Sequence, residues 1–223
     1  MQGKKPLRIE EMSAQIERLV PGSAEEDGSK RRQIIDGARQ VFMAQGFDAA
    51  SMGEIARAAG VSKGTLYVYF KSKEELFEAI VGQQCKAQAE QIFNLDPQDH
   101  DVERVLTRLG TAFVQFLCRP GGAPPLRTVI AIAERMPEIG HRFYESGPAI
   151  GIAHLEGYLR AQVAAGVLVV EDCEVAAAQF MDACLATVFK PVLFNFGAAP
   201  TPERIEHVVK IAVRTFLAAY RAR

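Results

Sequence analysis

The sequence predicts an all-α protein with a small N-terminal three-helix domain followed by a larger helical domain. Apolar residues recur at helical spacing, rather than with the alternation of strands, in almost every segment between the prolines and glycines. Serines stand at the starts of several such segments, where their side chains can cap a helix. The 223 residues, 48% of them hydrophobic, are enough to bury a core.

Composition and spacing argue against several other classes of protein. No apolar run reaches the roughly 18 residues that span a bilayer, and residues 1–10 lack the apolar centre of a signal peptide, so we expect no membrane association and a cytoplasmic location. The cysteines and histidines lack the spacing of metal ligands, so we expect no metal site, no cofactor and isolated buried thiols. No catalytic grouping or phosphate-binding loop appears, so we expect no catalytic residues.

Residues 1–29 are expected to form an N-terminal arm and linker, with an apolar helical stripe at 6–20 and a polar linker at 21–29. The next helix is expected over 30–45, with Gly46 as a left-handed C-terminal cap. Its first turn would hold Lys-Arg-Arg at 30–32, where the helix dipole disfavours positive charge. This basic run is either a solvated patch or a place where an anion lies nearby.

Two short helices separated by a tight turn follow, which is the pattern of a helix-turn-helix. A capping box at 51–54 starts the first helix, Gly60 supplies the positive φ angle of the turn, and Ser62 caps the second helix. Another capping box at 72–75 opens a long helix towards Phe93. The buried positions of the motif are expected to be Ile55, Ala56, Leu66 and Phe70.

The second helix of such a motif enters the major groove, where its N-terminal residues contact base edges while flanking groups hold phosphates. Lys63 and Thr65 can reach bases or phosphate, and Gly64 permits close backbone approach. The hydroxyls of Tyr67 and Tyr69 can hydrogen-bond phosphate. The alternative is that the tyrosines are core aromatics and the lysines form a solvated surface.

Other groups of this domain, residues 30–76, can add to the contact. Val68 is either core or a contact to a thymine methyl, Lys73 adds positive charge, and the free amides at the helix starts are phosphate donors. Residues 30–80 contain eight Lys and Arg against six Asp and Glu, a surplus of two, and the basic groups lie mainly at helix starts.

The C-terminal domain, residues 77–223, should be helical throughout, with Pro191 kinking or ending its helix. The helix that contains Pro191 is apolar nearly all round, so we expect it to be buried against its own domain and a partner subunit. Together with the last helix it would form a symmetric four-helix dimer interface. The expected helices are 101–118, 126–136, 138–145, 149–165, 173–195 and 202–221, and the expected interface stripe on the last is Ile205, Val208, Val209, Ala212, Phe216 and Ala219.

Large or soft apolar side chains in these helices are candidates for the wall of a ligand cavity, with a plain hydrophobic core as the alternative for each. Arg127, Glu134 and Asp182 lie in otherwise apolar helices, so each is an ion-pair member or a polar anchor for a ligand. The apolar candidates are Phe113, Phe116, Phe143, Tyr144, Phe180, Met181, Cys184 and Phe189.

The N-terminal domain resembles the DNA-binding domain of the TetR family of bacterial repressors. The resemblance lies in RRQIIDGARQVFMAQGFDAASMGEIARAAGVSKGTLYVYFKSKEELFEAIV, and GVSKGTLYVYFKSKEELF is close to the most specific portion of the family. One departure is Tyr69, where histidine is common. The resemblance implies DNA contacts by Ser51, Met52, Ser62, Lys63, Gly64, Thr65, Tyr67, Val68 and Tyr69, with Lys73 on phosphate.

The C-terminal domain is similar to the regulatory domains of the AefR-like and AcrR-like members of that family, in RTVIAIAERMPEIGHRFYESGP and the later AGVLVVEDCEVAAAQF. The resemblance implies a ligand-responsive repressor that binds a palindromic operator as a homodimer through its last two long helices and is released by a small, largely apolar effector. An all-helical enzyme and a nucleoid protein without sequence preference are the alternatives. The arm at 1–29 either contacts DNA or packs on the larger domain.

Overall fold

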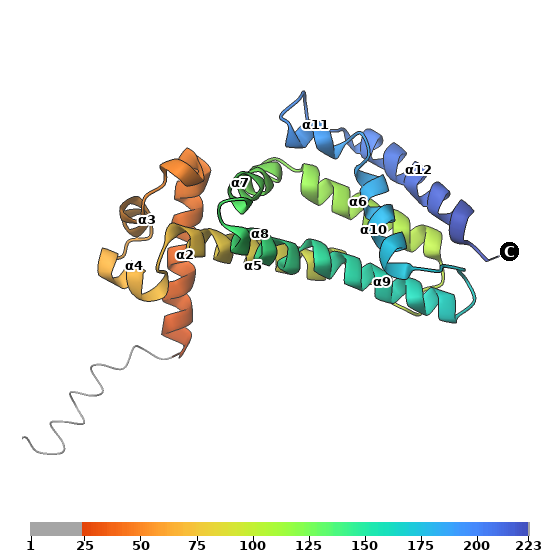
Figure 1. Ribbon diagram of the computed structural model, residues 1–223, viewed down its shortest axis with the longest axis horizontal. Coiled ribbons are helices and arrows are strands. Elements are labelled where there is room, and N and C mark those ends of the chain that lie inside the picture. Colours follow the sequence, from red (N-terminus) through yellow and green to blue (C-terminus); the bar gives the residue numbers. More distant parts are fainter. Residues whose placement is uncertain (1–23, 223) are drawn as a thin grey trace, which may run out of the picture. The chain divides into compact units, whose positions relative to one another are not determined.

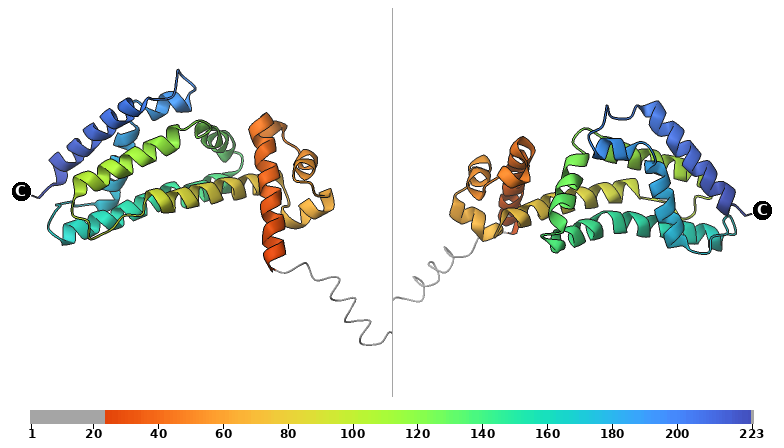
Figure 2. Two further views of the ribbon diagram at one scale, coloured as in Figure 1. Left: turned by 180° about the vertical axis from the view of Figure 1, so that it is seen from behind. Right: turned by 45° about the horizontal axis from the view of Figure 1, so that its top comes forward.

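The computed structural model describes residues 24–222, and the expected helix at 6–20 lies outside this range (Figures 1 and 2). The regular elements of this part are all helices, with one isolated β-bridge between Leu168 and Arg221. The chain divides into two compact units, the first ending at Phe77 and the second beginning at Glu78. This boundary falls inside one helix, and each unit is described separately below.

The first unit is a three-helix domain followed by the start of a long helix. Its core is built from aliphatic side chains of all four helices and from an aromatic cluster of Phe42, Phe47 and Phe77, whose ring centroids lie 5.2 to 5.7 Å apart. The helices are α2 (Ala24–Ala49), α3 (Met52–Ala58), α4 (Lys63–Tyr69) and α5 (Lys73–Ile92).

The start of α2 differs from the expectation. The helix begins at Ala24, so residues 24–29, assigned to the linker, are helical. The sequence AEED that opens it combines high helix propensity with acidic residue types, which favour a helix N-terminus. The basic run at 30–32 therefore lies beyond the first turn, and the predicted dipole penalty does not apply. Gly46 has the expected positive φ angle, 80°, and interrupts the helix before its last residues.

The second unit contains the rest of α5 and seven further helices. α12 packs on α6, and α10 packs on α9, α12 and α6, running across the direction of α9 and α12 (Figure 1). α7 packs on α8, and the short α11 contacts α6 and α7. The helices are α6 (Val102–Cys118), α7 (Ala123–Ala133), α8 (Pro137–Ser146), α9 (Pro148–Ala164), α10 (Cys173–Leu185), α11 (Phe189–Leu193) and α12 (Pro202–Tyr220).

The prediction of a single helix at 173–195 is wrong, because the helix is interrupted between α10 and α11. Thr187 adopts a φ angle of 63°, and its hydroxyl accepts a hydrogen bond of 2.7 Å from Arg204. In a continuous helix the ring of Pro191 would clash with the carbonyl four residues earlier, which is that of Thr187. Pro191 instead lies in the first turn of α11, where no N–H is needed. The proline thus acts one turn upstream of its own position.

None of the helices between residues 24 and 222 is long and apolar enough to cross a membrane. Among the side chains described in the same range, no group of three His, Cys, Asp or Glu residues could hold a metal ion.

Candidate DNA-binding face and ligand cavity

The turn between α3 and α4 is held by a Schellman motif. The Gly60 N–H donates to the Arg57 carbonyl at 3.1 Å, and the Val61 N–H donates to the Ala56 carbonyl at 3.0 Å. Gly60 has the predicted positive φ angle, 64°. The Gln33 side chain, on α2, donates to the Ala59 carbonyl at 2.6 Å. The turn is therefore fixed both by its own backbone and by α2.

Gly37 brings α2 into direct contact with this turn, a feature that the sequence analysis missed. A Cβ atom at Gly37 would lie 2.6 Å from the Ala59 nitrogen and Cα and 2.7 Å from its Cβ. Only glycine permits this approach, because real Cβ contacts are longer than 3 Å. The available signal was a glycine inside a helical apolar pattern, which often marks close packing.

The predicted serine caps are present. Ser51 Oγ accepts from the Glu54 N–H at 3.3 Å, and the Ser51 N–H donates to Glu54 Oε2 at 3.0 Å, which completes a capping box. The Ser51 hydroxyl also donates to Glu54 Oε2 at 2.7 Å, and the Gln45 side-chain amide donates to it at 3.1 Å. These two bonds, the first the stronger, together with the Ser51 N–H bond hold the pKa of Glu54 below its usual value. Ser62 Oγ accepts from the Thr65 N–H at 3.0 Å and also lies 2.8 Å from the Thr65 hydroxyl.

The outward face of α4 carries Lys63, Gly64, Tyr67 and Val68, all exposed. The Tyr67 side chain is 51% exposed and that of Val68 80%, so neither is a core residue in this unit. The opposite face is buried as predicted, with Leu66 in the core. The aliphatic stem of Lys63 lies over Gly53, where a Cβ would be 3.0 Å from Lys63 Cε.

Two other residues predicted to contact DNA, Tyr69 and Lys73, form hydrogen bonds with other groups of the protein. The Tyr69 hydroxyl hydrogen-bonds the Asp27 carboxylate, and this bond raises the pKa of Tyr69 above its usual value. The Lys73 ammonium donates to the carbonyls of Phe47, Asp48 and Ala50 at 2.9, 3.0 and 3.3 Å. Three carbonyls match the three N–H donors of an ammonium, so a phosphate hydrogen bond by Lys73 would require one of these contacts to break.

The remaining predicted positions lie close to this face. Ser51 is exposed, and Met52, the first residue of α3, is half-buried. Ser62 is exposed and Thr65 half-buried, and both use part of their hydrogen-bonding capacity in the α4 cap. Both short helices of the motif thus direct their N-terminal residues outward or to the edge of the unit.

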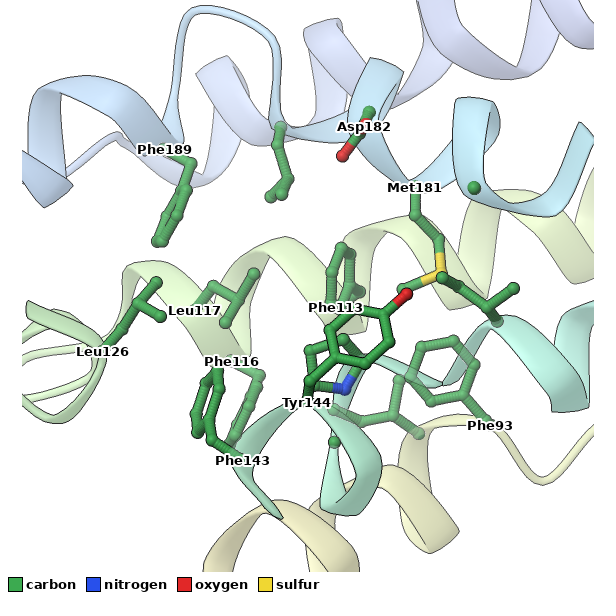
Figure 3. Close-up of a pocket in the computed structure, with 16 residues that line it drawn as sticks. Phe93, Phe113, Phe116, Leu117, Leu126, Phe143, Tyr144, Met181, Asp182 and Phe189 are labelled. Carbon is green, nitrogen blue, oxygen red and sulfur yellow. The ribbon is translucent and has the colours of Figure 1, made fainter. Parts of the chain in front are cut away.

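A cavity of about 450 Å³ lies in the second unit (Figure 3). Helices α5, α6, α8, α9, α10 and α11 supply most of its wall, and six of the sixteen lining side chains are aromatic. The Phe93 ring, at the C-terminal end of α5, packs edge-on against Phe113 with centroids 6.0 Å apart. The lining residues are Ile92, Phe93, Phe113, Phe116, Leu117, Leu126, Phe143, Tyr144, Gly147, Pro148, Ile152, Ala178, Met181, Asp182, Leu185 and Phe189.

The cavity brings together six of the eight predicted apolar candidates and one of the three polar candidates. The candidates that line it are Phe113, Phe116, Phe143, Tyr144, Met181, Asp182 and Phe189. Phe93 and Leu126 line it and were not predicted. Phe93 is the last buried residue before the loop to α6, and its position at a helix end was the only signal for it in the sequence.

Four candidates lie elsewhere. Phe180 packs edge-on against Phe216 in the core, and Cys184 Sγ fills the space beside Gly110, where burial raises the pKa of the thiol to about 12. Arg127 donates to the carbonyls of Val192 and Leu193 at 3.2 and 3.1 Å, at the C-terminal end of α11. Glu134 is exposed at the C-cap of α7. None of the four lines the cavity described above.

The predicted dimer stripe on α12 is also corrected. Five of its six members are buried in the core of their own unit, and only Ala219 is exposed. They pack against α6 and α10, so they are not available to a partner. The large apolar side chains that α10 and α12 leave exposed are Val175 and Ile211.

Comparisons with known proteins identify the family. Residues 34–80 match the model of bacterial regulatory proteins of the tetR family, and residues 104–222 match that of the AefR-like transcriptional repressor C-terminal domain. The regulator AcrR from Shigella flexneri is 48% identical over 50 residues, 22% of this chain and 23% of AcrR, so this chain spans about a quarter of the length of that curated relative.

Two solved structures match over nearly their whole length. A TetR-family protein from Mesorhizobium loti is 28% identical, with a TM-score of 0.81 over 87% of this chain and 98% of its own. The flavonoid-responsive regulator FrrA is 31% identical, with a TM-score of 0.76 over 88% and 99%. These relatives are transcriptional regulators rather than enzymes, which confirms the sequence-based expectation. The chain belongs to the TetR family of DNA-binding transcriptional regulators and carries an AefR-like C-terminal domain.

Proposed function

We propose that this protein is a ligand-responsive repressor that acts in the cytoplasm, binds a palindromic operator as a homodimer and is released by a small, largely apolar effector. The observation that carries the proposal is the presence of an outward recognition helix, α4, and an aromatic cavity in one chain. A nucleoid protein that binds DNA without preference would have no use for the cavity.

The proposed operator contacts centre on α4. Lys63 can bind phosphate or a guanine edge, the Tyr67 hydroxyl can donate to phosphate, and the methyls of Val68 can contact a thymine methyl. All three side chains are exposed on one face. Ser51, Met52, Ser62, Gly64 and Thr65 are proposed to complete the contact, and Tyr69 and Lys73 to act mainly by holding the unit together.

The effector is proposed to occupy the aromatic cavity. Its volume of about 450 Å³ falls in the range of small-molecule sites, and aromatic rings line it on several sides. FrrA, 31% identical, is named as flavonoid-responsive. Flavonoids are planar aromatic molecules, and an effector of that general shape fits the lining found here.

Two contacts are proposed to connect the cavity with α5, the helix that contains the boundary between the units. Phe93 lines the cavity from the C-terminal end of α5. Near its other end, the Glu78 carboxylate accepts a charged hydrogen bond of 2.6 Å from Arg142, which directly precedes the lining residues Phe143 and Tyr144. An effector that repacks the cavity would therefore act on α5 at both ends. To weaken DNA binding tenfold, the effector must bind the conformation that does not bind DNA about 1.4 kcal/mol more tightly than the conformation that does.

The homodimer is proposed to form through the outward faces of α10 and α12, which contain Val175 and Ile211. Ile211→Glu is expected to give a monomer in light scattering after size exclusion, because it places a charge within that face. Val169→Glu is the matched control, since Val169 is also exposed but lies outside both helices. A monomeric control, or a dimeric Ile211→Glu variant, would contradict this interface.

Operator binding is tested by titrating the purified chain with DNA from upstream of its own gene and with random DNA of equal length, at two salt concentrations. We expect tight, salt-sensitive binding that favours the upstream DNA. Tyr67→Ala should abolish the preference, whereas Tyr144→Ala, a tyrosine of similar exposure on the cavity, should keep it. Equal binding to both DNAs, and to DNA selected from a random library, would reject a sequence-specific regulator.

A further inference from the structure

The chemistry of the cavity lining is almost wholly apolar. Of its sixteen residues, fourteen have no polar side-chain group, and the two exceptions are Tyr144 on α8 and Asp182 on α10. Figure 3 shows the Tyr144 hydroxyl oxygen beside the Met181 side chain and the Asp182 carboxylate on the α10 side of the cavity. Asp182 is therefore the single charged residue among the residues that line this cavity.

The Asp182 carboxylate is exposed, and no hydrogen bond or ion pair joins it to any side chain or backbone group that the structure describes. Three cations stand next to lining residues in the sequence. Arg127 donates to the carbonyls at the end of α11, and Arg142 pairs with Glu78. The third, Lys190, makes no ion pair with Asp182 among the ion pairs of the described residues. An ionised carboxylate can only accept hydrogen bonds. A molecule in the cavity that makes a direct hydrogen bond to Asp182 must therefore offer a donor.

We propose that the effector is a planar aromatic molecule with a hydrogen-bond donor, a phenolic hydroxyl or an ammonium group, that bonds Asp182, and that the cavity rejects aromatic carboxylates. This inference rests on the proposed function of the cavity and names the class of ligand. The aromatic lining supplies apolar contact to any flat ring system of suitable size. Selection among such ligands falls to Asp182, which strengthens a bond to a donor and repels an anion.

The experiment measures binding of three naphthalene compounds that differ in one substituent: 2-naphthylmethylamine, 2-naphthol and 2-naphthoate. Each displaces the neutral apolar dye Nile red from the purified full-length chain, without DNA. We expect the amine and the naphthol to bind at least tenfold more tightly than the carboxylate, which corresponds to about 1.4 kcal/mol.

Asp182→Asn should reduce this preference to within about threefold, because an amide is neutral and can itself donate. The matched control is Glu174→Gln, which makes the same change of charge on the exposed start of α10, away from the lining. It should keep the preference of the unchanged chain. Since both positions are exposed, thermal denaturation is expected to show that both variants fold.

The outcomes separate the two proposals. Equal affinity of the unchanged chain for all three compounds, or an unchanged preference in Asp182→Asn, would overturn the role of Asp182 while leaving the cavity as a ligand site. If neither Nile red nor any of the compounds binds, the cavity is not a ligand site, and both the inference and the sensor part of the proposed function fail.

Discussion

Replacing Gly37 with alanine should displace the helix-turn-helix without touching any residue on the outward face of α4. The new Cβ would meet the Ala59 nitrogen, Cα and Cβ at 2.6 to 2.7 Å, and none of these atoms belongs to a flexible side-chain end. Ordinary carbon contacts are about 3.5 Å, so the turn must move by roughly 0.9 Å (3.5 minus 2.6). Because Ala59 caps α3 and stands just before the turn to α4, α4 would move with it.

The magnitude follows from two opposing effects. Alanine stabilises a helix interior relative to glycine by about 0.8 to 1 kcal/mol, whereas overpacking a close contact costs about 1 to 3 kcal/mol. We expect a net loss of about 1 kcal/mol of unfolding free energy. Gly28→Ala, in the same helix with nothing within 4 Å of the added carbon, should show only the propensity gain.

The assay is urea denaturation of both variants followed by circular dichroism, together with fluorescence anisotropy titration of operator DNA. We expect Gly37→Ala to unfold at lower urea than the parent and to bind operator at least tenfold more weakly, with Gly28→Ala at or above the parent in stability and equal in affinity. Equal stability and equal operator affinity of the two variants would refute the argument that Gly37 positions the turn.

Three other perturbations have outcomes that the structure predicts. Lys73→Met should lower the free energy of unfolding by about 1 to 3 kcal/mol, because three carbonyls lose their donor. It should leave the salt dependence of DNA binding unchanged. If Lys73 contacted a phosphate, the substitution would instead lower the magnitude of the slope of log affinity against log salt concentration by about 0.9. Burial, reinforced by Asp99, raises the pKa of Tyr158 from 10.0 to about 12. The folded state therefore keeps the Tyr158 hydroxyl proton to a higher pH than the unfolded state does, and the free energy of unfolding should fall between pH 10 and 12. Urea denaturation of Tyr158→Phe over this pH range should lack the fall. A double-mutant cycle of Glu78→Gln and Arg142→Gln should give a coupling free energy of about 1 kcal/mol, at the upper end for surface ion pairs. The reason is that the Glu78 side chain is only 14% exposed. A coupling near zero would remove this pair from the proposed connection between the cavity and α5.

The parts of the fold that depend on neighbouring residues could be predicted from the sequence. The Ser51 capping box, the positive φ angle of Gly60 and the burial of Leu66 each follow from residue types within one or two turns of helix, and the structure confirms all three. The role of Gly37 could not be predicted in this way, because its partner, Ala59, is 22 residues away (59 minus 37) and only the packed domain brings them together.

Hydrophobic periodicity predicted which faces are buried but not what buries them. The stripe on α12 was correctly identified as buried, yet α6 and α10 of the same chain cover it rather than a second subunit. The same limit applies to the aromatic candidates for the cavity. Phe113 lines the cavity and Phe180 lies in the core, although both occupy apolar helices with similar spacing. Residue type and period are identical for a wall and a core, so only the packing distinguishes them.

A polar residue type alone does not show whether its side chain is free to contact DNA. A tyrosine hydroxyl and a lysine ammonium are able to bind phosphate, but Tyr69 is engaged by Asp27 and Lys73 by three carbonyls. A phosphate competing for Tyr69 would also approach the Asp27 carboxylate, where like charges repel. We therefore propose that DNA recognition by α4 depends mainly on exposed side chains that form no hydrogen bond with the described residues of the domain, of which Tyr67 and Val68 are the large ones. Substitutions at these two positions should change operator affinity without changing stability, whereas substitution of Lys73 should change both.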